Sequence, residues 1–242
     1  MENNFIYICF VFVIAGLVKG VTGMGLPTVA MSLLVLVLKP VEAAALLVVP
    51  SLLTNVWQLM AGSPVYPIWQ RFWPMMAGIC AGTLIGSAIL PISVAATSTL
   101  GVALVVYAAI GLTGMRWHTK EASTSWLSPV IGVATGMLTA ATGMFVLPAV
   151  PYLQSLGLQK EDLIQAMGLS FTASTAMLAV AMAAHGAWEP SVAGFSLMAQ
   201  LPAMLGMLIG NWLRKRMQPE KFRRFFLTSM LLLGAHMVTK SF

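Results

Sequence analysis

Charged residues are scarce in this sequence. They make up 8% of the 242 residues, whereas soluble domains usually carry about 25%. A chain with so few charges cannot cover a water-facing surface, which excludes the soluble globular classes. Apolar runs of about 20 residues, long enough to cross a bilayer, recur along the chain instead, and 59% of all residues are hydrophobic. The sequence therefore predicts an all-α integral membrane protein.

Groups that perform acid–base or metal chemistry are also few. The chain has seven acidic residues, three histidines and two cysteines, and they form no cluster inside the apolar runs. This argues against a membrane-embedded enzyme, and neither a cofactor nor a metal site is expected. The net charge of +6 does not indicate nucleic-acid binding, because the cations fall in short gaps between apolar runs, where they set topology.

Eight apolar segments can be distinguished, and two of them are unusually long. The segments cover approximately 5–38, 41–61, 72–91, 93–113, 126–158, 163–185, 190–213 and 222–239. The first and fifth exceed one ordinary span and are interrupted by glycine. We therefore predict a first transmembrane repeat at 1–115, a cytoplasmic linker at 116–125 and a second transmembrane repeat at 126–242.

The two halves resemble each other in sequence. Thr22-Gly23-Met24 corresponds to Thr142-Gly143-Met144, and Gly16 corresponds to Gly136. Further matches pair 51–55 with 170–174 and GTLIGS at 82–87 with GMLIGN at 206–211. The matches keep the same order at a nearly constant offset. Internal repeats of this kind are typical of secondary transporters.

The distribution of cations favours inverted rather than parallel halves. If the first and fifth segments are re-entrant hairpins, each half crosses the membrane three times. One side then collects most of the cations, namely Arg71, Arg116, Lys120, Lys160 and the cluster at 214–224. Lys and Arg accumulate in cytoplasmic loops, so this side is predicted to be cytoplasmic, with both termini outside. Eight single crossings would instead give parallel halves.

The interrupted segments are the best candidates for a substrate site. Gly20, Gly23 and Gly25 are expected to let the chain turn at membrane depth, where irregular backbone occurs only inside protein or beside a wet cavity. Leu26-Pro27 then begins a second half-helix, whose free N–H groups favour an anion. Ala141–Phe145 is expected to repeat the arrangement in the second half. The alternative is that these glycines only allow close helix packing.

Polar residues inside the apolar segments complete the predicted site. Lys19 is the only charged residue between Phe5 and Leu38, and an intramembrane charge is a functional candidate by default, although it could also snorkel to an interface. Hydroxyls and amides in the second and sixth segments suit an oxyanion or ordinary interhelical hydrogen bonds. The predicted substrate-binding residues are Lys19, Gly20, Thr22, Gly23, Met24, Gly25, Asn55, Thr142, Gly143, Met144, Ser170 and Ser174.

The motifs around these residues resemble a known family. GLVKGVTGMGLPTVAMSLL in the first half, and GVATGMLTAATGMFVLPAVPYLQSLGL followed by QAMGLSFTAST in the second, are similar to the TauE/SafE family of sulfite-exporter-like permeases. The resemblance covers nearly the whole chain. It implies movement of small sulfur-containing or organic anions across bacterial inner membranes. Ala140 and Phe145 depart from the family's glycine pattern, which implies a tighter or bulkier second tip.

The predicted function is secondary transport of a small organic or sulfur-containing anion by alternating access. The anion would be held at the paired broken-helix tips of a multi-pass protein in the bacterial inner membrane. A passive anion channel with the same pore is the alternative, and a structural partner subunit would not need paired broken helices. The predicted partners are the anion and the lipid bilayer, with no nucleic acid. Coupling to protons and a homodimer are both compatible with this prediction.

Overall fold

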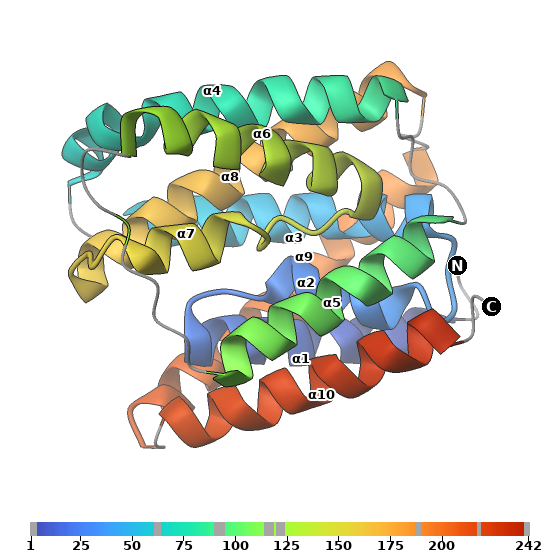
Figure 1. Ribbon diagram of the computed structural model, residues 1–242. Helices are drawn as coiled ribbons and strands as arrows, with labels where there is room; N and C mark the ends of the chain where they lie inside the picture. Colours follow the sequence, from blue (N-terminus) through green and yellow to red (C-terminus); the bar gives the residue numbers. More distant parts are fainter. Residues whose placement is uncertain are drawn as a thin grey trace. The chain divides into compact units, whose positions relative to one another are not determined.

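A computed structural model describes residues 4–60, 64–89, 95–113, 119, 124–186, 190–216 and 219–239. These residues form ten helices and no strand. In chain order the helices are α1 (Phe5–Thr22), α2 (Leu26–Leu34), α3 (Pro40–Met60), α4 (Val65–Ile89), α5 (Ala95–Thr113), α6 (Thr124–Thr142), α7 (Ala149–Ser155), α8 (Lys160–Ala184), α9 (Pro190–Arg214) and α10 (Pro219–Thr239). Figure 1 labels them along the ribbon.

The helices are apolar enough for a membrane protein. Within the described residues, five of them are long and apolar enough to cross a bilayer, at Phe5–Thr22, Pro40–Met60, Val65–Ile89, Glu161–Ala184 and Gly194–Arg214. Shorter apolar helices cover Ser98–Thr113 and Phe226–Thr239. The prediction of an all-α integral membrane protein is confirmed. Most of the predicted linker at 116–125 lies outside the described residues, which include only 119, 124 and 125 of it.

The chain forms two compact units, and each draws on both halves of the sequence. Unit 1 comprises Met1–Pro50, Ser93–Gly114 and Gly186–Phe242, and unit 2 comprises Ser51–Ile92 and Met115–His185. The boundary between the units falls inside α3, directly after Pro50. In unit 1, α1 packs against α9 and α5 packs against α10, while in unit 2, α4 packs against α6 and α8.

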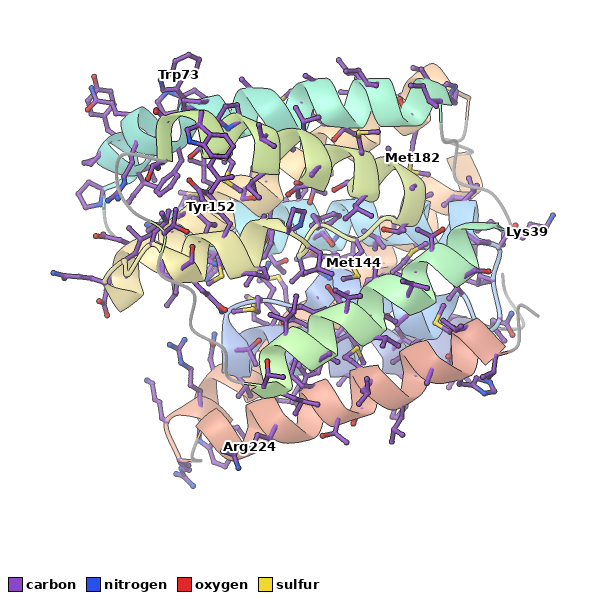
Figure 2. All side chains as sticks on the ribbon, in the orientation of Figure 1. Lys39, Trp73, Met144, Tyr152, Met182 and Arg224 are labelled. Atoms are coloured by element: carbon purple, nitrogen blue, oxygen red, sulfur yellow. The ribbon has the colours of Figure 1, made fainter. Side chains whose placement is uncertain are left out.

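Each of the two long segments folds as a broken hairpin rather than as one crossing. In unit 1, the Tyr7 hydroxyl near the start of α1 donates to the Leu33 carbonyl at the end of α2, over 2.7 Å. In unit 2, Ser128 in α6 and Tyr152 in α7 share a hydrogen bond of 2.6 Å. Figure 2 shows Met144 at the tip of this second hairpin and Tyr152 back near the start of α6. Both segments therefore return to the end of the unit from which they start.

Glycines let the helix pairs approach to backbone contact, and equivalent residues do so in both units. A β-carbon added to Gly82 would meet the backbone of Val133, and one added to Gly206 would meet that of Val13. The next glycine in each helix, Gly86 and its equivalent Gly210, also makes a close contact. Gly86 faces Met137 and Ala140, and Gly210 faces Leu17 and Gly20. Residue numbers increase in the same direction along α4 and α6 where the two helices touch, and the same holds for α1 and α9. Each pair is therefore parallel.

The fourth and eighth segments run in opposite directions. In unit 1, Gly101 of α5 faces Gly234 of α10, and Gly111 faces Leu227, so residue numbers rise along one helix while they fall along the other. Figure 1 shows α5 and α10 side by side in this arrangement. Inverted halves require opposite directions here, whereas eight single crossings would make the two segments parallel. The inversion across a membrane itself stays a prediction.

Candidate functional site

The repeated Thr-Gly-Met motif ends the first helix of the hairpin in unit 1. Gly23 has a φ of 78°, which favours glycine, and its N–H donates to the Lys19 carbonyl over 2.7 Å. The Thr22 hydroxyl lies 2.8 Å from the Val18 carbonyl oxygen and 2.7 Å from that of Met24, and it accepts from the Met24 N–H over 3.2 Å. The motif thus closes the helix with local bonds.

The same turn recurs in unit 2. Gly143 has a φ of 68°, and its N–H donates to the Thr139 carbonyl over 2.8 Å. The Thr142 hydroxyl donates to the Leu138 carbonyl over 2.6 Å and accepts from the Met144 N–H over 3.2 Å. The hydroxyls of Thr22 and Thr142 were predicted to bind substrate. In the structure both hydroxyls hold the turn together, which explains why the sequence Thr-Gly-Met occurs in both halves of the chain.

Only the hairpin in unit 1 restarts as a helix directly after the turn. Gly25, with a φ of 100°, precedes the first residue of α2, and Pro27 occupies its first turn. The Val29 N–H donates to the Gly25 carbonyl over 2.8 Å, so the amides before it project from the helix start. The Thr28 hydroxyl in this first turn is fully buried and has no hydrogen-bond partner. The sequence analysis missed Thr28, although its place just after a proline at a helix start could have indicated it.

The tip in unit 2 departs from this arrangement. Its second helix, α7, begins only at Ala149 and has seven residues. Phe145 occupies the position that corresponds to Gly25, and its buried ring packs against Phe171 with 6.2 Å between centroids. Ala141–Phe145 therefore repeats the turn of unit 1 but not the immediate start of a helix after it, and an anion site at this tip stays a prediction. A buried ring replaces the flexible glycine, and the first helical bond, from the Val150 N–H to the Val146 carbonyl over 2.9 Å, begins one residue later than in unit 1.

Lys19 and Gly20 both lie inside α1 rather than in the turn that follows it. Lys19 is in the last turn of α1 with its side chain 3% exposed, and it is the one charged side chain among the buried residues that the structure describes. A β-carbon added to Gly20 would meet the backbone of Met207 in α9. The prediction that Gly20 forms part of the turn is wrong, because the helix continues to Thr22 and Gly20 serves close packing.

Side chains from α5 and α10 cover the tip in unit 1. The Tyr107 hydroxyl lies 3.6 Å from the Met24 sulfur. A β-carbon added to Gly25 would lie 3.6 Å from the ring of Phe226. One predicted position faces open space instead, because a β-carbon at Gly23 would meet nothing within 4 Å. The tip is thus flanked by two aromatic rings that the sequence analysis did not single out.

The remaining predicted residues lie on α3 and α8 in unit 2. Asn55, Ser170 and Ser174 are all 0% exposed. The Asn55 amide donates to the Thr175 hydroxyl over 3.4 Å. The structure therefore brings together Lys19, Thr22, Gly23, Met24 and Gly25 in unit 1, with Gly20 in the adjoining helix. In unit 2, Asn55 contacts Thr175, the neighbour of Ser174 in sequence, and the same unit contains Ser170, Thr142, Gly143 and Met144.

Metal-binding and redox groups are not gathered anywhere in the described ranges. No group of three His, Cys, Asp or Glu residues there could hold a metal ion. Cys9 and Cys80 are free and half-buried, in different units. The polar groups at the two tips and on α3 and α8 are hydroxyls, amides and one ammonium. Groups of these kinds can bind an anion through hydrogen bonds.

Comparison with protein families identifies the chain's relatives. A family model described as "Sulfite exporter TauE/SafE" matches residues 8–237, nearly the entire length. Comparison with curated proteins found no match, and comparison with solved structures found none either. Proteins of this family are membrane transporters and not enzymes. With its apolar helices and broken hairpins, the chain belongs to the TauE/SafE sulfite exporter family and is a multi-pass membrane transporter.

Proposed function

We propose that the chain is a secondary transporter of a small organic or sulfur-containing anion. It would work by alternating access in the bacterial inner membrane. The family supports transport across a membrane, and the substrate class and mechanism are our proposal. Because α7 has no helix start that corresponds to that of α2, we assign the anion to the tip in unit 1 rather than to both tips.

The start of α2 is the observation that supports anion binding most directly. Its first-turn amides have no partner within the helix, and the helix dipole favours negative charge at this end. The Thr28 hydroxyl in the same turn is fully buried and unpartnered. Since side chains of a helix lean toward its N-terminus, Thr28 lies on the side of these amides. A buried hydroxyl without a partner costs about 1–3 kcal/mol, which an anion oxygen would recover.

Lys19 supplies the charge that a membrane-embedded anion needs. Its side chain is 3% exposed and belongs to the last turn of α1, directly before the turn at Gly23. Burying a lysine at the centre of a membrane helix costs at least about 2.5 kcal/mol on insertion scales. Retaining it there is understandable if its ammonium neutralises the substrate's charge when the anion is bound.

Counterflow in proteoliposomes tests the proposed function. Vesicles that contain the purified chain and an excess of unlabelled sulfite should accumulate labelled sulfite transiently against its gradient. Methanesulfonate should be tested in the same way, since the substrate could be organic. A transporter gives saturable flux and counterflow. Flux that neither saturates nor shows counterflow would identify a passive anion channel and overturn the proposal.

Substitutions at the tip in unit 1 test the site. Lys19→Met keeps the side-chain length and removes the charge, so anion affinity should fall by roughly 1.5–3 kcal/mol, as for a charge-assisted hydrogen bond. Lys19→Arg should recover only part of the lost anion affinity, because the guanidinium group is planar and larger than the ammonium group. Thr28→Val should also weaken binding. Ser32→Ala is the matched control, because the Ser32 hydroxyl in the same helix donates to the Thr28 carbonyl and should not affect affinity.

A further inference from the structure

The end of α9 and the start of α10 in unit 1 carry a concentration of positive charge. The cations there are Arg214, Lys215, Arg216, Lys221, Arg223 and Arg224, and Glu220 is the one acidic residue of that stretch of sequence. Among the residues whose side chains the structure describes, Lys215, Arg216 and Arg224 are exposed. This end of unit 1 therefore attracts negatively charged groups from outside the protein.

Arg216 is held on the face of an exposed tryptophan. The central carbon of its guanidinium lies 4.2 Å from the centre of the Trp212 ring, which is within the range of a cation–π contact. The Trp212 side chain is 54% exposed. The backbone between the two residues is also closed, since the Arg216 N–H donates to the Leu213 carbonyl over 2.8 Å. An arginine fixed in this way still has N–H donors for a two-oxygen acceptor such as a phosphate.

A second arginine lies over a ring but lacks this setting. The Arg71 guanidinium lies 5.6 Å from the centre of the Phe72 ring in unit 2. Phe72 is fully buried, so its ring offers no surface to a partner from outside. Trp212 is exposed and also has an indole N–H donor, and tryptophans with this exposure are typical of the border between hydrocarbon and headgroups in a membrane.

An exposed apolar row on α9 leads to Trp212. Leu201, Leu205, Leu208 and Trp212 follow one another at intervals of three or four residues, which places them on one helix face. Each of these side chains is between 54% and 70% exposed, whereas Gly206 lies on the side of α9 that packs against α1. At 1.5 Å per residue the row is roughly 17 Å long, about half the thickness of the hydrocarbon core. It therefore matches the depth of one lipid leaflet.

The charge at the end of this row selects its occupant. An acyl chain fits the apolar part, and a headgroup phosphate fits the arginine beyond it. A headgroup with its own ammonium would be repelled by the neighbouring cations, so a net anionic phospholipid is favoured. A two-fold dimer built on this face would bring equivalent surfaces together. Because both copies share one orientation in the bilayer, their cation clusters would then lie close to each other and repel.

We propose that Trp212 and Arg216, together with the apolar row of α9, form a binding site for one anionic phospholipid. The phosphate binds the Arg216 guanidinium, the indole of Trp212 lies at the headgroup border, and an acyl chain lies along Leu208, Leu205 and Leu201. This inference does not rest on the proposed function, because it concerns the outer face of α9 and not the tip of the hairpin.

Lipid titration of the purified full-length chain in a non-ionic detergent tests the site. Dioleoylphosphatidylglycerol should raise the melting temperature, whereas dioleoylphosphatidylcholine should not. Arg216→Gln should increase the apparent dissociation constant for phosphatidylglycerol about tenfold, the loss expected for a hydrogen bond to a charged group. Trp212→Leu keeps an apolar side chain but removes the ring, and should increase it about threefold. Both side chains are exposed, so the melting temperature without lipid should stay close to that of the wild type.

Arg224→Gln is the matched control. It removes the same charge from an exposed arginine of unit 1, but from α10 (Figure 2). The dissociation constant for phosphatidylglycerol should change less than about twofold, because a single distant surface charge contributes little. Equal weakening by Arg216→Gln and Arg224→Gln would show that the lipid is attracted by diffuse charge, and the site would be overturned.

Two further measurements distinguish the phospholipid from other occupants. Inorganic phosphate has the anionic group without an acyl chain, so it should stabilise the protein far less than phosphatidylglycerol does. Equal stabilisation by phosphate would overturn a lipid site. Native mass spectrometry should show bound phosphatidylglycerol that Arg216→Gln loses. If it shows instead a dimer that Leu205→Gln dissociates while lipid affinity is unchanged, the row is an interface between two copies and the proposal is wrong.

Discussion

The hydroxyl of Ser196 in α9 donates a hydrogen bond to the carbonyl oxygen of Leu46 in α3, over 2.8 Å. Both residues are fully buried in unit 1. In a regular helix this carbonyl would accept from the N–H of residue 50, but residue 50 is proline and has none. A side chain from a distant part of the sequence therefore replaces the missing helix bond, at the residue where α3 leaves unit 1.

This relationship predicts that Ser196→Ala and Pro50→Ala are coupled. Ser196→Ala alone leaves a buried carbonyl unsatisfied and should lower the free energy of unfolding by about 1–3 kcal/mol. In a Pro50→Ala background the alanine N–H can bond to Leu46, so the same substitution should cost much less. Thermal unfolding of the four proteins in detergent gives the coupling energy. Equal costs in both backgrounds would show that Ser196 does not replace the missing bond.

Two glycines of different type should respond differently to valine. Gly23→Val should abolish transport but leave the protein inserted, because a β-branched residue opposes the positive φ and projects into open space at the tip. Gly82→Val should instead reduce folding yield, since its side chain would meet the backbone of Val133. Flux and detergent-extracted yield should be measured for both. Normal transport by Gly23→Val would remove the tip in unit 1 from the site.

Two glutamines hold α3 against α8, and an isosteric change tests them. The Gln58 amide donates to the Ile164 carbonyl over 2.9 Å, and the Gln165 amide donates to the Leu59 carbonyl over 3.1 Å. Gln58→Glu keeps the shape but replaces a donor with an acceptor facing a carbonyl. The melting temperature should fall at neutral pH, with a loss of about 1 kcal/mol in the free energy of unfolding for a broken, partly buried hydrogen bond. An unchanged melting temperature would show that this contact does not stabilise unit 2.

Cysteine labelling in intact membranes tests the inverted topology. Lys39 and Arg224 lie at opposite ends of unit 1 in Figure 2. After replacement of the free Cys9 and Cys80, we expect Lys39→Cys to react from outside and Arg224→Cys only from the cytoplasm. His118→Cys and Gln218→Cys, which lie outside the described residues, should both react from the cytoplasm. Labelling of 39 and 224 from one side, or of 118 and 218 from opposite sides, would favour parallel halves.

The sequence was most informative where a residue's role depends on its own neighbours. The interruptions at Thr22-Gly23-Met24 and Thr142-Gly143-Met144 were predicted, because a helix end and its glycine are local features. The same reasoning failed for Gly20, since a glycine in a turn and a glycine against another helix look alike until the partner, here Met207, is known. For the second tip it indicated a bulkier turn from Phe145, but it could not show that this ring packs against Phe171, because that contact depends on α8.

Hydroxyl groups were the least predictable part of the candidate site. Thr22, Thr142, Ser170 and Ser174 looked equivalent in the sequence, as polar residues in apolar segments. In the structure the two threonines bond within their own turn, whereas the two serines are buried without a partner. The choice between a local bond and an open donor is made by side-chain rotamer and surrounding packing, and neither can be read from residue type.

The backbone contacts at Gly16, Gly82, Gly206 and the other packing glycines have a mechanical consequence. Where two helices meet backbone to backbone at glycines, neither can slide along the other without bringing side chains into the partner's carbonyl groups. This applies to α1 against α9 and to α4 against α6. Each pair is therefore expected to move as one rigid body. The short return helix α2 adds to this stiffness, because its end is tied to α1 by the hydrogen bond between Tyr7 and Leu33 and nearly all of its residues are buried.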